Sequence, residues 1–284
     1  MQEKPIVVIY HKKCPDGFGA AYAAWKKFGD TAEYIPAGYG GDLPEHLEGK
    51  EVYILDFSFD REEEMAELLK VAKRVVAIDH HESGRAFTEQ APEHVYDPNR
   101  SGATLAWAYF HPDTPMPELM QYLEDGDTYR YAMPETETIF AYLVVQPDDF
   151  LVWDRIVHAL EDDNERPALL AKASAYQEYF ERMGHLLVES AKKVQFEGYE
   201  CYFSSSFPSI TLRSHVAHEL YTELPPIALV VSAHPDGFGV SIRGDGSVDV
   251  AKIAEKYGGG GHPGSAGFFI PANHPLPWQE ITES

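Results

Sequence analysis

Three short apolar segments near the amino terminus each run directly into residues that can bind a metal ion. Residues 5–10 are followed by His11, residues 51–55 by Asp56, and residues 74–78 by Asp79-His80-His81. Segments of this length and composition are typical of β-strands. The carboxyl ends of parallel strands meet at one edge of an open α/β sheet, where such folds place their sites. The sequence therefore predicts carboxylates and imidazoles gathered at one sheet edge.

The segments between these strands favour helices, which predicts an α/β unit with a mostly parallel sheet. The expected strands are 6–10, 32–35, 52–55 and 75–78, with helices at 17–28 and 61–71. Further helices are predicted at 103–110, 117–124, 137–144 and 148–161. The long amphipathic run 166–194 is predicted to form one helix that connects two domains.

After residue 195 the pattern changes to short strands, which predicts a smaller α+β domain. The expected strands are 199–204, 227–233, 239–242 and 267–270, with a helix at 249–257. Pro235-Asp236-Gly237 lies between two apolar runs and is typical of a hairpin turn. We therefore expect a metal-binding domain at 1–165, a connector helix at 166–194, a substrate-binding domain at 195–284, and an active-site cleft between the two domains.

The charge of the chain limits its partners. Its 284 residues carry a formal net charge of −23, and such a field repels polyanions, so long duplex nucleic acid is not expected to bind. Short phosphorylated ligands remain compatible, because bound divalent cations can invert the local potential. Cys14 and Cys201 are too few for a disulfide framework or a cysteine zinc site. With no apolar run of ~18 residues and no signal-peptide pattern, we expect a cytoplasmic protein without a membrane partner.

Four blocks of residues together resemble the DHH family of phosphoesterases, which includes RecJ-type exonucleases, nano-RNase-type oligoribonucleases and family II pyrophosphatases. The blocks are residues 11–17, Leu55-Asp56, Asp79-His80-His81 and residues 124–127. A fifth block, residues 240–243 with 259–262, resembles the DHH-associated domain that binds the rest of the substrate. The order and spacing of the blocks make the resemblance specific.

The resemblance implies one or two divalent ions, usually Mn²⁺, with Mg²⁺ or Co²⁺ as alternatives. It implies a metal-ligand set of His11, Asp16, Asp56, Asp79, His80 and Asp127. It also implies that a metal hydroxide attacks phosphorus, and that His80 and His81 act in catalysis, His81 by contacting the phosphate or assisting the leaving oxygen. Carboxylates and neutral imidazoles suit Mn²⁺ or Mg²⁺, and paired ions stabilise the attacking and leaving oxygens.

The first block departs from the family pattern, which has a His and two Asp one residue apart, because only Asp16 is present. Depending on alignment, either Cys14 or Phe18 occupies the other carboxylate position. A Cys14 thiolate could still ligate and would favour a softer metal, whereas Phe18 would remove one ligand. In the fourth block Asp127 fits the family spacing better than Asp125, which could instead cap the local turn.

The second domain is predicted to bind the distal part of the substrate. Arg243 resembles the residue that pairs with a terminal phosphate, a geometry that guanidinium matches bidentately. The glycine run suits close backbone approach to a phosphate or nucleotide, and its candidate residues are Gly259, Gly260, Gly261 and His262. Arg100, at the start of a helix, is a further phosphate candidate, and the alternative there is an ordinary helix cap.

Taken together, these residues predict a divalent-metal-dependent phosphodiesterase that hydrolyses short oligonucleotides or dinucleotides. The acidic composition favours short substrates, because affinity for long polymers depends on many Lys or Arg phosphate contacts. Two alternatives stay open. One is a phosphomonoesterase on a nucleoside bisphosphate or a polyphosphate phosphatase. The other is a nucleotide-binding sensor that lost turnover with the missing carboxylate. The sequence leaves the oligomeric state open, a homodimer included.

Overall fold

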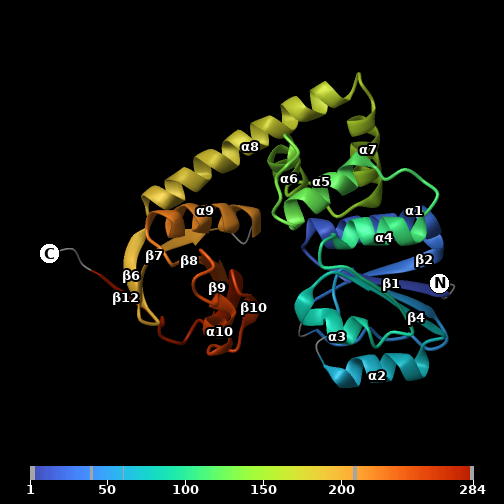
Figure 1. Cartoon of the computed structure of the whole chain (residues 1–284), viewed down its shortest axis with the longest axis horizontal. Coiled ribbons are helices and arrows are strands. Elements are labelled where there is room, and N and C mark those ends of the chain that lie inside the picture. The colour runs from blue at the N-terminus through green and yellow to red at the C-terminus, as the bar shows by residue number, and fades with distance from the viewer. Residues whose placement is uncertain (1–3, 39–40, 60, 207–209, 282–284) are drawn as a thin grey trace. The chain divides into compact units, whose positions relative to one another are not determined.

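The computed structural model describes residues 4–38, 41–59, 61–206 and 210–281. The chain divides into two compact units, Met1–Ser174 and Ala175–Ser284 (Figure 1). Within the described residues, every helix is too short or too polar to cross a membrane. Each unit has its own sheet and its own apolar core.

The described part of the first unit is built on a five-stranded, wholly parallel sheet in the order β2-β1-β3-β4-β5. Its strands are β1 (Ile6–His11), β2 (Ala32–Ala37), β3 (Glu51–Leu55), β4 (Arg74–Asp79) and β5 (Glu93–Tyr96). Because β1 is flanked by β2 on one side and β3 on the other, the direction of winding reverses between β1 and β3. Open sheets of this order bind ligands at the carboxyl ends of the strands beside that reversal.

Helices cover both faces of this sheet, which explains why its three central strands, β1, β3 and β4, are continuously buried rather than alternating. Figure 1 shows one pair of helices on one face, α1 (Pro15–Phe28) and α4 (Gly102–Phe110), and another pair on the opposite face, α2 (Glu62–Val71) and the short α3 (Arg85–Thr88). Alternate residues of β1, β3 and β4 pack with Met65 and Leu68 of α2. The intervening residues, such as Val8 and Val76, are equally buried.

Phe18 of α1 belongs to an aromatic core and does not face the sheet edge. This core is formed with α7 (Phe150–Glu161), which follows α5 (Glu118–Asp127) and α6 (Thr136–Leu143) in the chain. The Phe18 ring is 2% exposed and stacks on Phe150, with ring centroids 4.9 Å apart and planes at 11°. Trp153 contacts the same ring edge-on at 4.9 Å. Phe18 therefore cannot occupy the missing carboxylate position of the first block.

Substitution of Phe18 tests this placement. Phe18→Ala is expected to lower the free energy of unfolding by about 3–5 kcal/mol, since it leaves a cavity among aromatic rings. Phe18→Asp is expected to lower it at least as much, because it buries an unpaired carboxylate. Urea unfolding followed by circular dichroism measures both, with Leu151→Ala at an exposed position of α7 as control. A Phe18→Asp protein as stable as the unmodified chain would contradict the placement.

The predicted connector helix is shorter than expected. Helix α8 (Arg166–Glu189) begins in the first unit and ends in the second. Residues Lys192–Phe196, of which the prediction placed 192–194 in the helix, form strand β6 and pair with β7 (Tyr199–Ser206). Val194 and Phe196 are buried and Gln195 between them is exposed. This period of two residues explains why a strand replaces the end of the helix.

The second unit has the expected α+β organisation. Within its described residues the sheet order is β10-β11-β9-β8-β7-β6-β12, antiparallel except for the β7–β8 pair. The further strands are β8 (Ile227–His234), β9 (Gly237–Gly244), β10 (Gly260–His262), β11 (Ser265–Pro271) and β12 (Gln279–Glu280). Strands β8 and β9 form the hairpin predicted from Pro235-Asp236-Gly237. Helix α9 (Ile210–Glu223) packs on one face and α10 (Val250–Glu255) on the other.

Candidate metal centre

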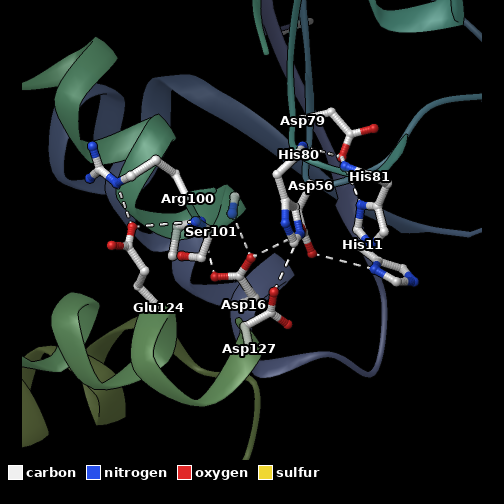
Figure 2. Close-up of polar contacts among 12 residues, drawn as sticks. His11, Asp16, Asp56, Asp79, His80, His81, Arg100, Ser101, Glu124 and Asp127 are labelled. Carbon is white, nitrogen blue, oxygen red and sulfur yellow. Dashed lines mark hydrogen bonds and ion pairs between the residues drawn. The ribbon is translucent and has the colours of Figure 1, made fainter. Parts of the chain in front are cut away.

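Carboxylates and imidazoles from five segments of the first unit converge at the carboxyl edge of the parallel sheet, where Figure 2 shows them pointing toward one another. Three of them follow strands, as the sequence predicted: His11 ends β1, Asp56 follows β3 and His80 follows β4. Asp16 comes from the first turn of α1, and Asp127 is the last residue of α5. The cluster therefore lies beside the reversal between β1 and β3.

His80 lies at the centre of the cluster. Its Nε2 atom is 3.2 Å from Asp56 Oδ1, 3.4 Å from Asp127 Oδ2 and 3.7 Å from Asp16 Oδ2. The second oxygen of Asp56, Oδ2, is 3.3 Å from His11 Nδ1. Among the described residues, ligand atoms lie within 4.8 Å of one another in three groups: Asp16, His80 and Asp127; His11, Cys14 and Asp56; and Asp56, Asp79, His80 and His81. Each group is compact enough to hold one cation.

Asp56 belongs to two of these groups, and its surroundings are those of a metal ligand. The residue is 1% exposed, and neither carboxylate oxygen accepts a hydrogen bond of good geometry from the described residues. Its backbone is left-handed, with φ of 63°. A buried carboxylate is costly unless it is paired or coordinates a metal, and the partners of Asp56 are the imidazoles of His80 and His11. Such backbone strain adds roughly 1–3 kcal/mol. The residues present therefore fit one or two divalent cations.

The electrostatics of the cluster also favour cations. Burial, reinforced by Asp56 and Asp127, raises the pKa of Asp16 well above its ordinary value. Against the effect of burial, the carboxylates, with Asp56 foremost, raise the pKa of His80 to about 10. Protons thus balance the crowded negative charge. A divalent cation would replace them, because metal binding requires ionised carboxylates and neutral imidazole.

Asp16 is held in place by the start of α4. Its Oδ2 accepts a hydrogen bond from the Gly102 backbone N–H at 2.6 Å, and its Oδ1 accepts one from Ala103 at 3.1 Å. The amino terminus of a helix favours a carboxylate through its unpaired N–H groups and its dipole. Ser101 caps the same helix by accepting from Thr104 N–H. The carboxylate of Asp16 is therefore fixed between α4 and His80.

A side chain at position 102 would collide with Asp56, so substitution of Gly102 tests whether Asp56 binds a cation. A Cβ atom at this position would lie 2.5 Å from Asp56 Oδ1 and 2.6 Å from Asp56 Cβ. Gly102→Ala is expected to displace Asp56 and to weaken Mn²⁺ binding by about 10–100-fold, the range typical for lost support of a ligand. Titration calorimetry measures the affinity. Gly264→Ala, where the nearest atom to an added Cβ is 4.0 Å away, is the control, and equal affinities of the two variants would contradict the assignment.

Asp79, predicted as a metal ligand, lies within 4.8 Å of ligand atoms of Asp56, His80 and His81, and its carboxylate also orients His81. Asp79 Oδ1 accepts hydrogen bonds from the backbone N–H of His80 at 2.8 Å and of His81 at 3.2 Å. The same oxygen lies 2.7 Å from His81 Nδ1, and Oδ2 accepts from Thr88 Oγ1 at 3.4 Å. A carboxylate that orients an imidazole in this way supports the site from behind.

Asp125, the alternative to Asp127, is occupied in shaping the loop that follows α5. It accepts hydrogen bonds from the backbone N–H of Ala132 and Met133 and from the Thr136 hydroxyl. Although burial opposes the effect, these donors hold the pKa of Asp125 below its usual value. The geometry thus favours the turn-stabilising alternative for Asp125, and Asp127 stays the predicted ligand of this block.

Arg100, predicted as a phosphate ligand, is paired within the first unit. Its Nε donates to Glu124 Oε2 at 2.5 Å, and Figure 2 shows its side chain directed toward Glu124 rather than toward the cluster. The neighbouring Ser101 forms an ordinary helix cap. The structure therefore favours the cap alternative at this position. The sequence did not reveal the pairing, because Glu124 lies on a separate helix.

In the second unit Arg243 lies on β9, and Arg213 of α9, which the sequence analysis missed, lies near it. Arg243 donates to Ser214 Oγ at 3.3 Å and to the Ile242 carbonyl at 3.1 Å. Arg213 donates to Ser241 Oγ at 3.2 Å. Burial, together with the charge of Arg243, lowers the pKa of Arg213. Two neighbouring guanidinium groups create a positive region in an otherwise acidic chain. The feature that could have drawn attention to Arg213 is its position near the start of α9.

The glycine run is required for packing. A Cβ atom at Gly259 would lie 2.1 Å from the Gly267 carbonyl oxygen, and one at Gly261 would lie 2.5 Å from that of Ser265. A Cβ atom added at Gly260 would meet no atom within 4 Å. Of these three glycines, Gly260 is therefore the one whose backbone a ligand could approach. The side chain of His262 lies outside the part of the chain that the structure describes.

Comparison with known proteins shows what this chain is similar to. Residues 213–281 match the DHHA1 domain. An uncharacterized protein of Acanthamoeba polyphaga mimivirus is 26% identical over 302 residues, which cover 98% of this chain and 70% of that protein.

Two solved structures share the fold across both units. The exonuclease RecJ bound to manganese is 17% identical with a TM-score of 0.54, over 93% of this chain and 85% of that chain. The pGpG-specific phosphodiesterase PggH from Vibrio cholerae is 16% identical with a TM-score of 0.50, over 94% of each chain. The resemblance predicted from the sequence is thereby confirmed in two respects: residues 213–281 match the DHHA1 domain, and the chain shares its fold with RecJ and PggH.

Proposed function

We propose that the protein is a divalent-cation-dependent phosphohydrolase that cleaves phosphodiester bonds in short oligonucleotides or dinucleotides. The observation that carries the proposal is Asp56, a buried carboxylate that links two groups of ligand atoms and accepts no hydrogen bond of good geometry from the described residues. Two similar structures support it: RecJ was solved with manganese, and PggH is described as specific for pGpG.

The chain offers ligands for one or two cations. Two cations are favoured, because the group that contains His80 and the group that contains Asp56 meet where these two side chains lie 3.2 Å apart. The proposed ligands are His11, Asp16, Asp56, His80 and Asp127. Their oxygen and nitrogen atoms suit Mn²⁺, with Mg²⁺ or Co²⁺ as alternatives. Bound there, divalent cations would polarise a phosphoryl oxygen and lower the pKa of a bound water. The protein would contribute by fixing the ligands, as Asp16 shows through its bonds to α4.

His81 is suited to act on the substrate rather than on a cation. Its Nδ1 faces Asp79, so a proton passed to a leaving oxygen would come from Nε2. Against the effect of burial, the hydrogen bond to Asp79 and the charge of Asp56 raise the pKa of His81. A protonated imidazole can contact a phosphate oxygen or protonate the leaving group.

Removing the central imidazole tests the proposed function. His80→Ala is expected to reduce Mn²⁺-dependent hydrolysis of a linear dinucleotide by at least roughly 10²-fold, as loss of a group at the reacting centre does. The thermal unfolding midpoint, measured with saturating Mn²⁺, shows whether the variant still folds, because His80 belongs to neither of the two units' apolar cores but is paired with buried carboxylates. The exposed His158 of α7 provides the matched control, His158→Ala. Full activity of His80→Ala would refute the assignment.

A substrate panel separates the proposal from its alternatives. The unmodified protein with Mn²⁺ is given a linear dinucleotide, a nucleoside bisphosphate and inorganic polyphosphate. We expect mononucleotide products from the dinucleotide. Phosphate release from polyphosphate alone would exclude the nuclease function, and release from the bisphosphate alone would favour a phosphomonoesterase. Nucleotide binding without any turnover would favour the sensor.

Two exposed tyrosines close to Asp127 favour a substrate with bases. Tyr129 is 66% exposed and Tyr131 is 47% exposed, with ring centroids 6.3 Å apart. Both have left-handed backbones, with φ of 55° and 46°, and the backbone N–H of Tyr131 donates to the Asp125 carbonyl. Strained backbone persists where the surroundings enforce it and is common at ligand sites. Aromatic rings presented in this way are suited to stack on nucleobases.

The double variant Tyr129→Ala, Tyr131→Ala tests this role. Base–aromatic stacking contributes ~1–3 kcal/mol per base, so we expect KM for a dinucleotide to rise at least about fivefold. The Mn²⁺ affinity should stay unchanged, because neither ring supplies a ligand atom. Tyr179→Ala, at an exposed position of α8, is the matched control. An unchanged KM in the double variant would remove the tyrosines from the binding site.

A further inference from the structure

The missing carboxylate of the first block leaves Cys14 at the edge of the cluster. Building on the cation site proposed above, we propose that Cys14 is a ligand of the cation held by His11 and Asp56. Its sulfur would make this position prefer softer divalent ions such as Co²⁺ or Zn²⁺ over Mn²⁺ or Mg²⁺. The protein would then hold two cations of different chemical preference.

The geometry assigns the position to Cys14. The backbone is left-handed at Lys13, with φ of 57°, and Cys14 follows as the residue that precedes α1. Ligand atoms of His11, Cys14 and Asp56 all lie within 4.8 Å of one another. Cys14 is partly exposed, so a cation can reach it. Phe18, the other residue that could fill the position, is buried against Phe150.

An independent feature shows that a ligand belongs between these residues. Asp56 is 1% exposed, and neither of its oxygens accepts a hydrogen bond of good geometry among the described residues. Its oxygens face the imidazoles of His11 and His80 at 3.3 Å and 3.2 Å, so positive charge is favoured beside this carboxylate whatever residue stands at position 14. Cys14 therefore lies beside a site whose requirement for positive charge is set by another residue.

The surroundings of Cys14 do not fit the other uses of a cysteine. Reactive thiolates lie beside cationic groups or metals, whereas the nearest charged group in the set that holds the Cys14 sulfur is the carboxylate of Asp56. A purely structural cysteine is packed in a core, as Cys201 is. Cys201 is fully buried among Val194, Ile227 and other apolar side chains of the second unit.

The two groups of ligands would select different ions. Asp16, His80 and Asp127 offer only oxygen and nitrogen, which suit Mn²⁺ or Mg²⁺. His11, Cys14 and Asp56 add a sulfur, and thiolate ligands favour Co²⁺ and Zn²⁺ over oxygen-seeking ions. Replacing the sulfur by a carboxylate should remove this difference.

The test uses Co²⁺ as a spectroscopic probe of the full chain. Metal-free protein is titrated with Co²⁺ and its near-ultraviolet absorption is recorded. We expect a thiolate-to-cobalt charge-transfer band in the unmodified protein and in Cys201→Ala, and no band in Cys14→Ser. In Cys14→Asp, competition between Zn²⁺ and Mn²⁺ should shift toward Mn²⁺ by roughly tenfold or more, since a soft ligand has become a hard one.

Alkylation of the unmodified protein gives a second measurement that does not depend on the folding of a variant. Iodoacetamide should modify Cys14 in the metal-free protein, and saturating Co²⁺ should slow that reaction at least tenfold, located by mass spectrometry. Absence of the charge-transfer band at saturation, or equal alkylation with and without Co²⁺, would overturn the role of Cys14.

The outcomes also separate this inference from the proposed function. A charge-transfer band in a protein that hydrolyses no phosphodiester would support Cys14 as a ligand and end the proposed function. Hydrolysis without the band would end only the role of Cys14. A protein that binds neither Co²⁺ nor Mn²⁺ would end both.

Discussion

The buried carboxylate of Asp56 is the feature on which the rest of the site depends. Strand β3 delivers it to the sheet edge beside β1, and its left-handed backbone turns the side chain into the cluster. Gly102 can lie against it only because that residue has no side chain, and Asp16 holds the start of α4 at this place. A carboxylate in such a position is stable when positive charge is close, which links the local fold directly to cation binding.

The chain divides its chemistry between the two units. The first unit gathers its negative charge around His80, where cations would reverse the potential that a phosphate meets. The second unit brings Arg213 and Arg243 together in a chain with a net charge of −23. Positive charge would be confined to the cations of the first unit and to this arginine pair. Such a chain would suit short anionic substrates better than long polymers, whose binding depends on many Lys or Arg phosphate contacts. The cleft expected between the units stays a prediction.

Much of the site could be predicted from the sequence, because strand ends fix where His11, Asp56 and His80 must lie. What failed depended on contacts between distant segments or on local geometry. The hydrogen bonds that Asp79 accepts from backbone N–H groups, and its contact with His81, could not be predicted from the sequence. Packing of Phe18 against α7 decided that Cys14, and not Phe18, faces the cluster. The last residues of the helix predicted at 166–194 belong instead to a strand of five residues, too short for its two-residue alternation to stand out in the sequence.

The most direct test of the account is the anomalous diffraction of a crystal grown with Mn²⁺. The account predicts manganese density in contact with the carboxylate of Asp56 and within reach of His80, with a second peak beside His11 when both positions are filled. Manganese density only at exposed acidic side chains, with nothing bound at Asp56 under saturating Mn²⁺, would contradict the central claim that this carboxylate is a cation ligand.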